Sequence, residues 1–222
     1  MSQYEIEIKS LLGSFERARK LKEKIKEKGG EFVRSNNQLN HYFILNDVNK
    51  FKEKFNSHLF GEDKVKFNNI IEEGSNFSVR TRDTDGKVLL VIKASIDNDT
   101  SANGVSRIEF ESEMKITLNE LDKLLLDAGL EYQAKWSRER EEYKLDDINV
   151  CLDKNAGYGY LAEFEKVVPD KFVTESVKEE LLKIMKSFGV EELPQDRLER
   201  MFAHYNSNWR DYYGTEKIFN ID

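Results

Sequence analysis

The stretch Tyr4–Lys9, read as YEIEIK, places charged and apolar side chains at alternate positions. A period of two residues is typical of a β-strand, because successive side chains point to opposite faces of a sheet. One face of this strand is apolar, and the other carries Glu5, Glu7 and Lys9. Since an apolar strand face has to be covered, the pattern predicts helices packed on one side of a sheet.

Further strands are predicted where apolar or alternating runs return along the chain. They cover residues 32–33, 41–44, 77–82, 88–94, 107–115, 138–145, 148–153 and 161–167. Asp85-Gly86 marks a hairpin turn between two of them, and residues 97–104 are predicted to be a polar loop. Because most of these strands follow one another directly, we expect a largely antiparallel sheet.

Apolar stripes and capping residues predict the helices. The first helix is capped by Ser14, and its stripe consists of Phe15, Ala18, Leu21 and Ile25. Residues 47–55 and 62–71 predict two short helices within an insertion at about 46–73.

The second half of the chain carries clear helix starts. Thr117 with Glu120 forms a capping box, and the helix that follows it stops at Gly129. Thr174 and Pro194 mark the starts of two helices in a C-terminal extension at about 174–222. The fold class is therefore predicted to be α+β, in one domain that covers residues 1–222.

Composition excludes several classes of protein. The chain has 222 residues, a net charge of -7 and 11% aromatic residues, which argues against a disordered chain. The acidic balance argues against nucleic acid as a partner, and no apolar run approaches the ~20 residues of a membrane span. The first residues lack the apolar core of a signal peptide and Cys151 is the only cysteine, so we expect a cytoplasmic protein without a disulfide framework.

Like charges share a face on five of the predicted strands. The acidic pairs are Glu5 and Glu7, Glu109 and Glu111, and Glu163 and Glu165, and the basic pairs are Arg80 and Arg82, and Arg138 and Arg140. Two interpretations are open. The charged face is the solvated side of an ordinary antiparallel sheet, or the sheet closes into a barrel with a charged interior.

The second interpretation accounts better for the pairing of like charges. Neighbouring carboxylates repel each other unless a cation lies between them. Neighbouring arginines repel each other unless an anion lies between them. Carboxylate oxygens are suitable ligands for Mg²⁺ or Mn²⁺, whereas guanidinium and ammonium groups bind phosphate oxygens. A site that holds both sets suits a metal-bound polyphosphate.

Glu5-Ile6-Glu7-Ile8-Lys9 resembles the E-x-E-x-K signature of the CYTH superfamily, also called triphosphate tunnel metalloenzymes. That family includes class IV adenylyl cyclases, thiamine triphosphatases and inorganic triphosphatases. Later stretches resemble its other motifs in the same order, across residues 4–166. They are Ser78–Arg82 for R-x-R, Leu89–Lys93 for a strand ending in lysine, Arg107–Glu111 for R-x-E-x-E, Arg138–Tyr143 for K-x-R-x-x-Y with Arg in the Lys place, Asp153 for a lone inward aspartate, and Gly159–Glu165 for G-x-F-x-E-x-E.

The resemblance implies an eight-stranded antiparallel β-barrel, open at both ends as a tunnel, with helices outside. The metal ligands it implies, for one or two Mg²⁺ or Mn²⁺ ions, are Glu5, Glu7, Asp153, Glu163 and Glu165. The groups it implies for binding the triphosphate are Lys9, Arg80, Arg82, Lys93, Arg138 and Arg140, of which Lys9, Arg80 and Arg82 are implied to be catalytic. Glu109 and Glu111 could contact metal or orient the arginines, and we favour the second role, with Arg107 as their partner.

The implied substrate is a small molecule that bears a triphosphate, but the reaction is left open. We favour hydrolysis of inorganic triphosphate, thiamine triphosphate or a nucleoside triphosphate, because the sequence shows no feature for purine recognition. The alternative is a class IV adenylyl cyclase that forms cyclic AMP and pyrophosphate, and a third is a non-catalytic binding module. Many relatives end in a short Ser-Tyr motif, whose place is taken here by Arg200–Tyr213.

The remaining candidates are predicted to have no chemical role. His41, His58 and His204 are scattered without metal-ligand spacing and are expected to be structural or surface residues. Cys151 is not expected to be a nucleophile. The oligomeric state is expected to be a monomer or a homodimer.

Overall fold

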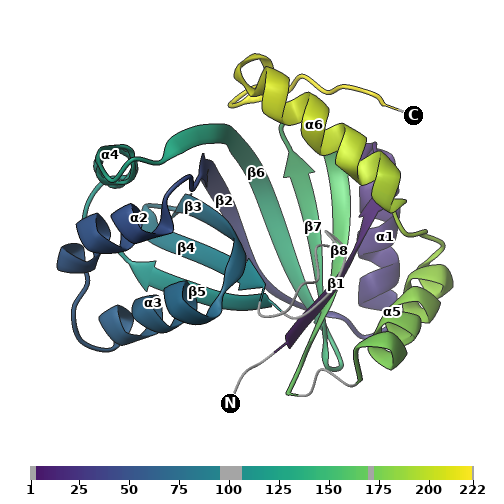
Figure 1. Ribbon diagram of the computed structural model, residues 1–222. Helices are drawn as coiled ribbons and strands as arrows, with labels where there is room; N and C mark the ends of the chain where they lie inside the picture. Colours follow the sequence, from purple (N-terminus) through teal and green to yellow (C-terminus); the bar gives the residue numbers. More distant parts are fainter. Residues whose placement is uncertain (1–3, 96–106, 170–172, 222) are drawn as a thin grey trace. The chain divides into compact units, whose positions relative to one another are not determined.

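The computed structural model of the chain describes residues 4–95, 107–169 and 173–221, without the side chains of Tyr4 and Arg107. The polar loop predicted at 97–104 lies outside the described residues. The strands are β1 (Tyr4–Leu11), β2 (Glu31–Ile44), β3 (Ser75–Thr84), β4 (Lys87–Ser95), β5 (Arg107–Glu113), β6 (Glu131–Leu145), β7 (Ile148–Asn155) and β8 (Gly159–Val168). The helices are α1 (Phe15–Glu27), α2 (Val48–Phe55), α3 (Gly61–Glu73), α4 (Leu118–Asp127), α5 (Thr174–Phe188) and α6 (Gln195–Tyr212), with a short 3-10 helix η1 (Asn56–His58) (Figure 1).

The strands are hydrogen-bonded in the order β1-β8-β7-β6-β2-β3-β4-β5. The pairs β1–β8, β8–β7, β7–β6, β2–β3, β3–β4 and β4–β5 are antiparallel. Eight strands in a largely antiparallel sheet with accompanying helices confirm the predicted α+β class. Among the described strands the hydrogen-bonded series is open, with β1 and β5 at its ends.

The chain divides into two compact units, whose described residues are 4–37 and 137–221 in the first unit, and 38–95 and 107–136 in the second. The strands β2 and β6 contribute residues to both units. Each unit has its own hydrophobic core, formed where helices cover the apolar face of its strands. The prediction of a single domain over 1–222 stays a prediction.

In the first unit, α1 and α5 cover the apolar face of β1 and β8 (Figure 1). Ser14 caps α1, since its Oγ accepts a hydrogen bond from the backbone N–H of Arg17 at 3.3 Å. The core then contains Ile6 and Ile8 from β1 together with Leu21 and Ile25 from α1, all at most 2% exposed. Phe15, which was predicted to belong to this stripe, is 63% exposed. It is the first residue of the helix and lies beside the ring of Tyr160 rather than in the core.

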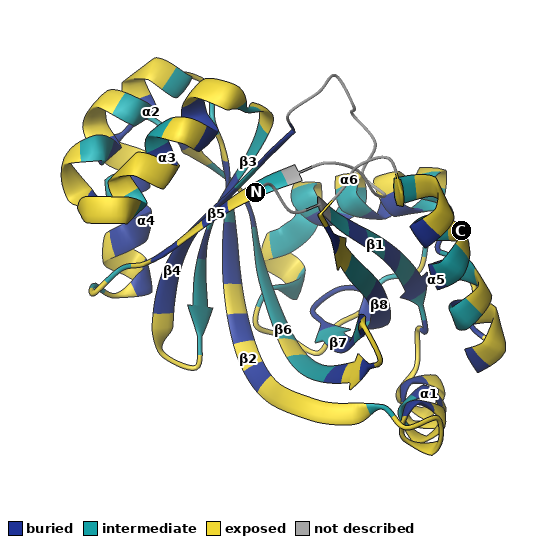
Figure 2. Ribbon diagram, turned by 90° about the horizontal axis from the view of Figure 1, so that it is seen from below, coloured by how far each residue is buried: buried dark blue, intermediate teal, exposed yellow. Residues whose placement is uncertain are grey.

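In the second unit, α2, α3 and α4 supply the helical layer, and each turns a buried side inward and an exposed side outward (Figure 2). Phe51, Phe55 and Phe67 are at most 1% exposed and pack with one another at ring-centroid distances of 5.4–6.0 Å. The segment predicted as an insertion at about 46–73 thus supplies a large part of this core. The Thr117–Glu120 capping box of α4 is present as predicted.

Several element boundaries differ from those predicted. The two short strands predicted at 32–33 and 41–44 are one strand, β2, which continues through the residues between them. The strand β6 begins at Glu131, seven residues before the predicted start. Thr174 is the first residue of α5 rather than its cap, which is Val173 without a side-chain hydrogen bond.

A buried carboxylate ties α4 to the strands of the second unit. Asp122 is 2% exposed and accepts hydrogen bonds from Thr81 Oγ1 at 2.6 Å and from the Tyr132 hydroxyl at 2.7 Å. His41 Nδ1 lies 2.6 Å from the same carboxylate. Burial alone would raise the pKa of Asp122, but the hydrogen bonds with His41, Thr81 and Tyr132 outweigh it and lower the pKa below its usual value.

Replacing Asp122 by Asn tests this cluster. At neutral pH we expect Asp122→Asn to lower the free energy of unfolding by about 2 kcal/mol or more, because buried hydrogen-bonding groups lose a charged acceptor. A carboxyl group whose pKa is lowered in the folded state stabilises the fold above its unfolded pKa of about 3.9 and loses that effect as the pH falls. The difference between wild type and variant in urea unfolding should therefore shrink as the pH falls from about 6 to about 3.

The matched control is Asp127→Asn, the same chemical change at an exposed position of α4. This control should alter the free energy of unfolding by less than about 0.5 kcal/mol. An Asp122→Asn effect that stays constant over the whole pH range would contradict the assignment.

Candidate active site

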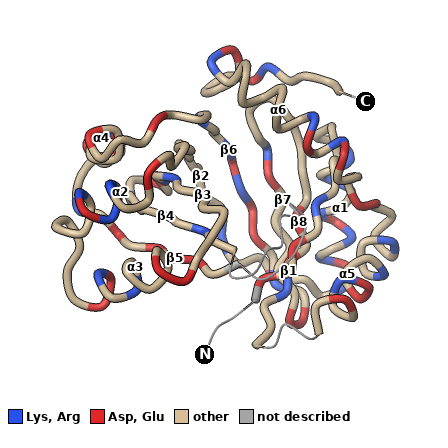
Figure 3. The backbone as a smooth tube through the Cα atoms, in the orientation of Figure 1, with Lys and Arg blue, Asp and Glu red and all other residues tan. Residues whose placement is uncertain are grey.

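Each unit turns a charged face away from its helices. On β1, β6, β7 and β8 of the first unit, the residues between the core positions form what we call the first charged face (Figure 3). Its members are Glu5, Glu7, Lys9, Arg138, Arg140, Asp153, Glu163 and Glu165. On β3, β4 and β5 of the second unit, the second charged face consists of Arg80, Arg82, Lys93, Glu109 and Glu111.

One end of the first charged face is acidic. Glu7 on β1 lies directly opposite Glu165 on β8, and Glu5 lies two residues before Glu7 on the same face. One carboxylate oxygen from each of these three residues lies within 4.8 Å of the others. Like charges directly opposite each other destabilise a sheet, so this arrangement favours a cation between them. All three side chains are half-buried, which leaves them accessible to a hydrated ion.

The donor set of this acidic cluster fits Mg²⁺ or Mn²⁺. Both ions prefer oxygen ligands, and Mg²⁺ usually keeps several waters while binding one or two carboxylates plus substrate phosphates. A cluster of three carboxylates, without a histidine or a thiolate, has the matching chemistry. Lys9 forms an ion pair with Glu7, and its Nζ lies 3.4 Å from Glu163. Lys9 therefore places a cationic group beside the acidic cluster.

The other end of the first charged face is a network of arginines and carboxylates. Asp153 on β7 is fully buried and accepts hydrogen bonds from Arg140 Nε at 2.7 Å, Arg140 Nη2 at 2.6 Å and Arg138 Nη1 at 3.0 Å. Arg140 Nη2 also donates a hydrogen bond to Glu163 on β8. The guanidinium groups of Arg138 and Arg140 are therefore held in fixed orientations.

The cationic groups control the ionisation of Glu163. Burial alone would raise the pKa of this carboxyl group, but Arg140, Lys9 and Arg138 outweigh it and hold the pKa well below its usual range. Burial would likewise lower the pKa of Arg140, yet Glu163 and Asp153 raise it well above its usual value. Both groups are charged at neutral pH, so the network is ionic.

The five predicted metal ligands fall into two groups. Glu5, Glu7 and Glu165 form the acidic cluster. Asp153 and Glu163 instead bond to the arginines, with Asp153 fully buried. That Asp153 and Glu163 bind metal stays a prediction.

In the second charged face, three cationic groups form ion pairs with acids of β5. Arg80 Nη2 lies 3.7 Å from Glu109, Arg82 Nη1 lies 3.8 Å from Glu111, and Lys93 Nζ lies 3.4 Å from Glu109. That Glu109 and Glu111 orient these cationic groups stays a prediction. The backbone of Arg107 lies in β5, and its side chain is outside the part of the chain that the structure describes.

Sequence analysis missed two residues of β2 that hold the arginines of the second charged face. Arg80 Nη1 donates to the Tyr42 hydroxyl at 2.8 Å, and Arg82 Nε donates to Asn40 Oδ1 at 3.0 Å. In the strand register Tyr42 lies opposite Arg80, and Asn40 opposite Arg82. The signal in the sequence is weak, because residues 35–40 are uncharged and polar except for Leu39, and such a stretch resembles a loop as much as a strand.

The histidines agree with their predicted roles, since His41 belongs to the buried Asp122 cluster, His58 is exposed, and His204 contacts the Tyr212 hydroxyl at 3.2 Å. Cys151 lies on β7, opposite Glu163 and two residues from Asp153, which is a more charged setting than the sequence suggested. Burial raises the pKa of the Cys151 thiol to about 12, and the side chain is 5% exposed. A thiol of this kind is a poor nucleophile.

The prediction for Cys151 can be checked with Ellman's reagent. At pH 8 a thiol with a pKa of about 12 has roughly a thousandfold less thiolate than an ordinary cysteine, so the native protein should react at least that much more slowly than free cysteine. In denaturant the same thiol should react at the ordinary rate. Rapid labelling of the native protein would show that Cys151 is accessible and ionised.

The comparisons with known proteins agree with this geometry. The CYTH domain model matches residues 3–197, and the chain therefore belongs to the CYTH family. MJ0240 of Methanocaldococcus jannaschii, named as a candidate adenylate cyclase, is 28% identical over 151 residues, which is 66% of this chain and 82% of that protein.

Two solved structures show the same fold. Protein PH1012 of Pyrococcus horikoshii has a TM-score of 0.61 and 21% identity, with 86% of this chain and 96% of that chain covered. HpAC1 of Hippeastrum, a candidate adenylyl cyclase described as having a dominant triphosphatase activity, has a TM-score of 0.56 and 17% identity, with 90% and 96% covered. None of the described helices is both long and apolar enough to cross a membrane.

Proposed function

We propose that this chain is a divalent-metal-dependent triphosphatase that hydrolyses a phosphoanhydride bond of a small triphosphate-bearing molecule. The observation that carries the proposal is the first charged face, where an acidic cluster adjoins Lys9 and two arginines. A metal-bound triphosphate needs both kinds of group, because the cation binds carboxylates and the phosphates bind cationic side chains.

The proposed roles follow from the contacts within each unit. Mg²⁺ or Mn²⁺, when bound, would offset phosphate charge and orient a water molecule. We assign its binding to Glu5, Glu7 and Glu165, with Asp153 and Glu163 as further candidates. Lys9, Arg138 and Arg140 would donate hydrogen bonds to phosphate oxygens and stabilise the charge that develops on the leaving group.

The second charged face is proposed to bind phosphate oxygens as well, through Arg80, Arg82 and Lys93. Tyr42 and Asn40 are uncharged acceptors, so they orient the two arginines without neutralising them. Glu109 restrains Lys93 at 3.4 Å. The two arginines keep their positive charge, which attracts phosphate oxygens.

A second candidate function is adenylyl cyclisation, which the name of the Methanocaldococcus jannaschii relative favours. The activity described for the Hippeastrum protein favours hydrolysis instead. In both reactions cationic groups stabilise the same triphosphate, and the difference is the attacking oxygen: water for hydrolysis, the ribose 3′-hydroxyl for cyclisation. Cytoplasmic location and a monomeric or homodimeric state stay predictions.

Product analysis distinguishes the two reactions. The protein is incubated with ATP, tripolyphosphate or thiamine triphosphate in the presence of Mg²⁺ or Mn²⁺, and the products are separated by ion-exchange chromatography. We expect orthophosphate with ADP, or orthophosphate from tripolyphosphate. Cyclic AMP with pyrophosphate would identify a cyclase, and binding of these compounds without turnover would identify a binding module.

Substitutions in β1 test the residue assignment. Lys9→Ala and Glu7→Gln should each lower turnover by about 10²-fold or more, because Lys9 would stabilise phosphate charge directly and Glu7 would hold the metal ion that offsets it. Both variants should keep the far-ultraviolet circular dichroism and the unfolding midpoint of the folded protein. Lys64→Ala and Glu53→Gln are matched controls at exposed positions and should keep wild-type turnover. Near-wild-type turnover in folded Lys9→Ala or Glu7→Gln would refute the assignment.

A further inference from the structure

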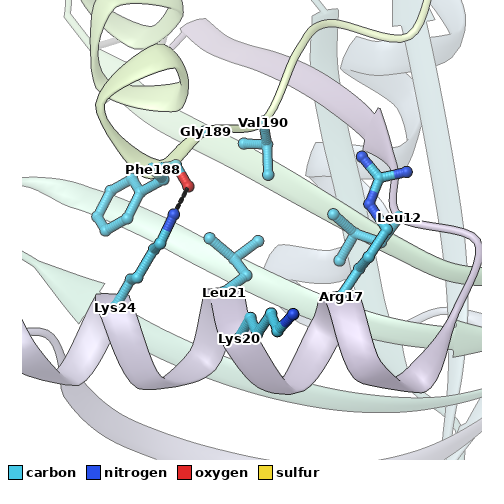
Figure 4. A pocket seen from close by; sticks show the side chains of 8 residues that line it. All are labelled: Leu12, Arg17, Lys20, Leu21, Lys24, Phe188, Gly189 and Val190. Carbon is cyan, nitrogen blue, oxygen red and sulfur yellow. Dashed lines mark hydrogen bonds between the residues drawn. The ribbon is translucent and has the colours of Figure 1, made fainter.

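A small pocket lies on the helical side of the first unit, between α1 and the end of α5 (Figure 4). Its volume is about 120 Å³. Leu12, Leu21 and Val190 supply apolar walls, and all three are at most 7% exposed. Pockets that hold drug-sized ligands measure ~300–1,000 Å³, so this one suits a small ion or a single chemical group.

Three cationic side chains of α1 line this pocket: Arg17, Lys20 and Lys24. Their spacing of three and four residues places them on one face of the helix, together with Leu21. None of the eight residues that line the pocket is acidic. The pocket is therefore a concave surface of positive charge with an apolar wall.

Two other cationic residues of α1 have close acidic partners. Arg19 is hydrogen-bonded to Glu16 at 2.8 Å and to Glu23 at 2.6 Å, and Lys22 pairs with Glu141 at 2.7 Å. By contrast, Arg17 makes no ion pair with any carboxylate of the described residues, and Lys20 reaches Glu16 only at 3.7 Å. Arg17 and Lys20, which line the pocket, thus lack a close acidic partner among the described residues (Figure 4).

Lys24 bonds to the end of α5 beside the pocket, and this contact makes the pocket more suitable for an anion. Its Nζ donates a hydrogen bond to the Phe188 carbonyl at 2.7 Å, at the end of α5. The carboxyl end of a helix carries partial negative charge, which would repel an anion. Because Lys24 satisfies and offsets that carbonyl, the local potential beside Arg17 and Lys20 remains positive.

We propose that this pocket is a second anion site, which binds inorganic phosphate or the phosphate group of a small monoester. The Arg17 guanidinium supplies a planar pair of donors, and the Lys20 ammonium group supplies a point charge, a combination that suits tetrahedral phosphate. The site is separate from the first charged face, because α1 covers the opposite, apolar side of β1. It does not depend on the proposed triphosphatase activity.

The test is a phosphate titration of the ¹⁵N-labelled protein followed by amide NMR, at constant ionic strength and with EDTA present. The amides of Gly189 and Val190 line the pocket and should shift saturably with millimolar phosphate. The variant Arg17→Gln/Lys20→Gln should weaken this binding about tenfold or more, because it removes two charge-assisted hydrogen bonds. The matched control Arg19→Gln/Lys26→Gln removes the same charge from α1 outside the pocket and should bind phosphate as the wild type does.

Two results would overturn the proposal. One is the absence of saturable shifts at Gly189 and Val190 in the wild-type protein. This result does not depend on whether the variants fold. The other is equal weakening by both double substitutions, which would show attraction to the helix as a whole. The amides of Glu7 and Lys9 report on the first charged face in the same spectra, so failure of the pocket is distinguishable from failure of the proposed active site.

Discussion

The strands of both units have two unlike faces, and only one of them can be covered by helices. In the first unit α1 and α5 cover the side of Ile6 and Ile8, and in the second α2, α3 and α4 cover the side of Val79 and Ile92. Although Glu141 and Lys166 lie on the helical side, where they bond to Lys22 of α1 and Glu180 of α5, the members of the two charged faces lie on the opposite side. There they have to be balanced against one another, since a buried charge without a partner is strongly unfavourable.

The two charged faces achieve this balance by different means. In the first, arginines and carboxylates bond directly, and the carboxylate of Asp153 is fully buried between Arg138 and Arg140. Removing one partner of such a buried pair typically costs about 3–5 kcal/mol, although the complete pair adds little net stability. The bonds of Asp153 therefore restrain the guanidinium groups of Arg138 and Arg140 more than they add net stability. The acidic cluster at the other end of this face is left with an excess of negative charge.

In the second charged face, uncharged groups make shorter contacts with the arginines than the carboxylates do. Tyr42 and Asn40 accept hydrogen bonds from Arg80 and Arg82 at 2.8 and 3.0 Å, whereas the carboxylates of Glu109 and Glu111 are 3.7 and 3.8 Å away. An amide or phenol oxygen fixes a guanidinium group but leaves its full charge. Membership of the CYTH family accords with the α+β fold, and its relatives include one named for cyclase activity and one described as having a dominant triphosphatase activity.

The sequence by itself determined the local features of this protein. Period-two alternation predicted which side of β1, β3 and β8 is charged, and capping residues predicted α1 and α4, because both signals act over a few neighbouring residues. The tertiary structure decided which charged groups meet. That Asp153 bonds to two arginines, that Glu5, Glu7 and Glu165 converge, and that Asn40 and Tyr42 hold the second pair of arginines all depend on strand register. Register brings together residues up to about 160 positions apart, and no local pattern specifies it.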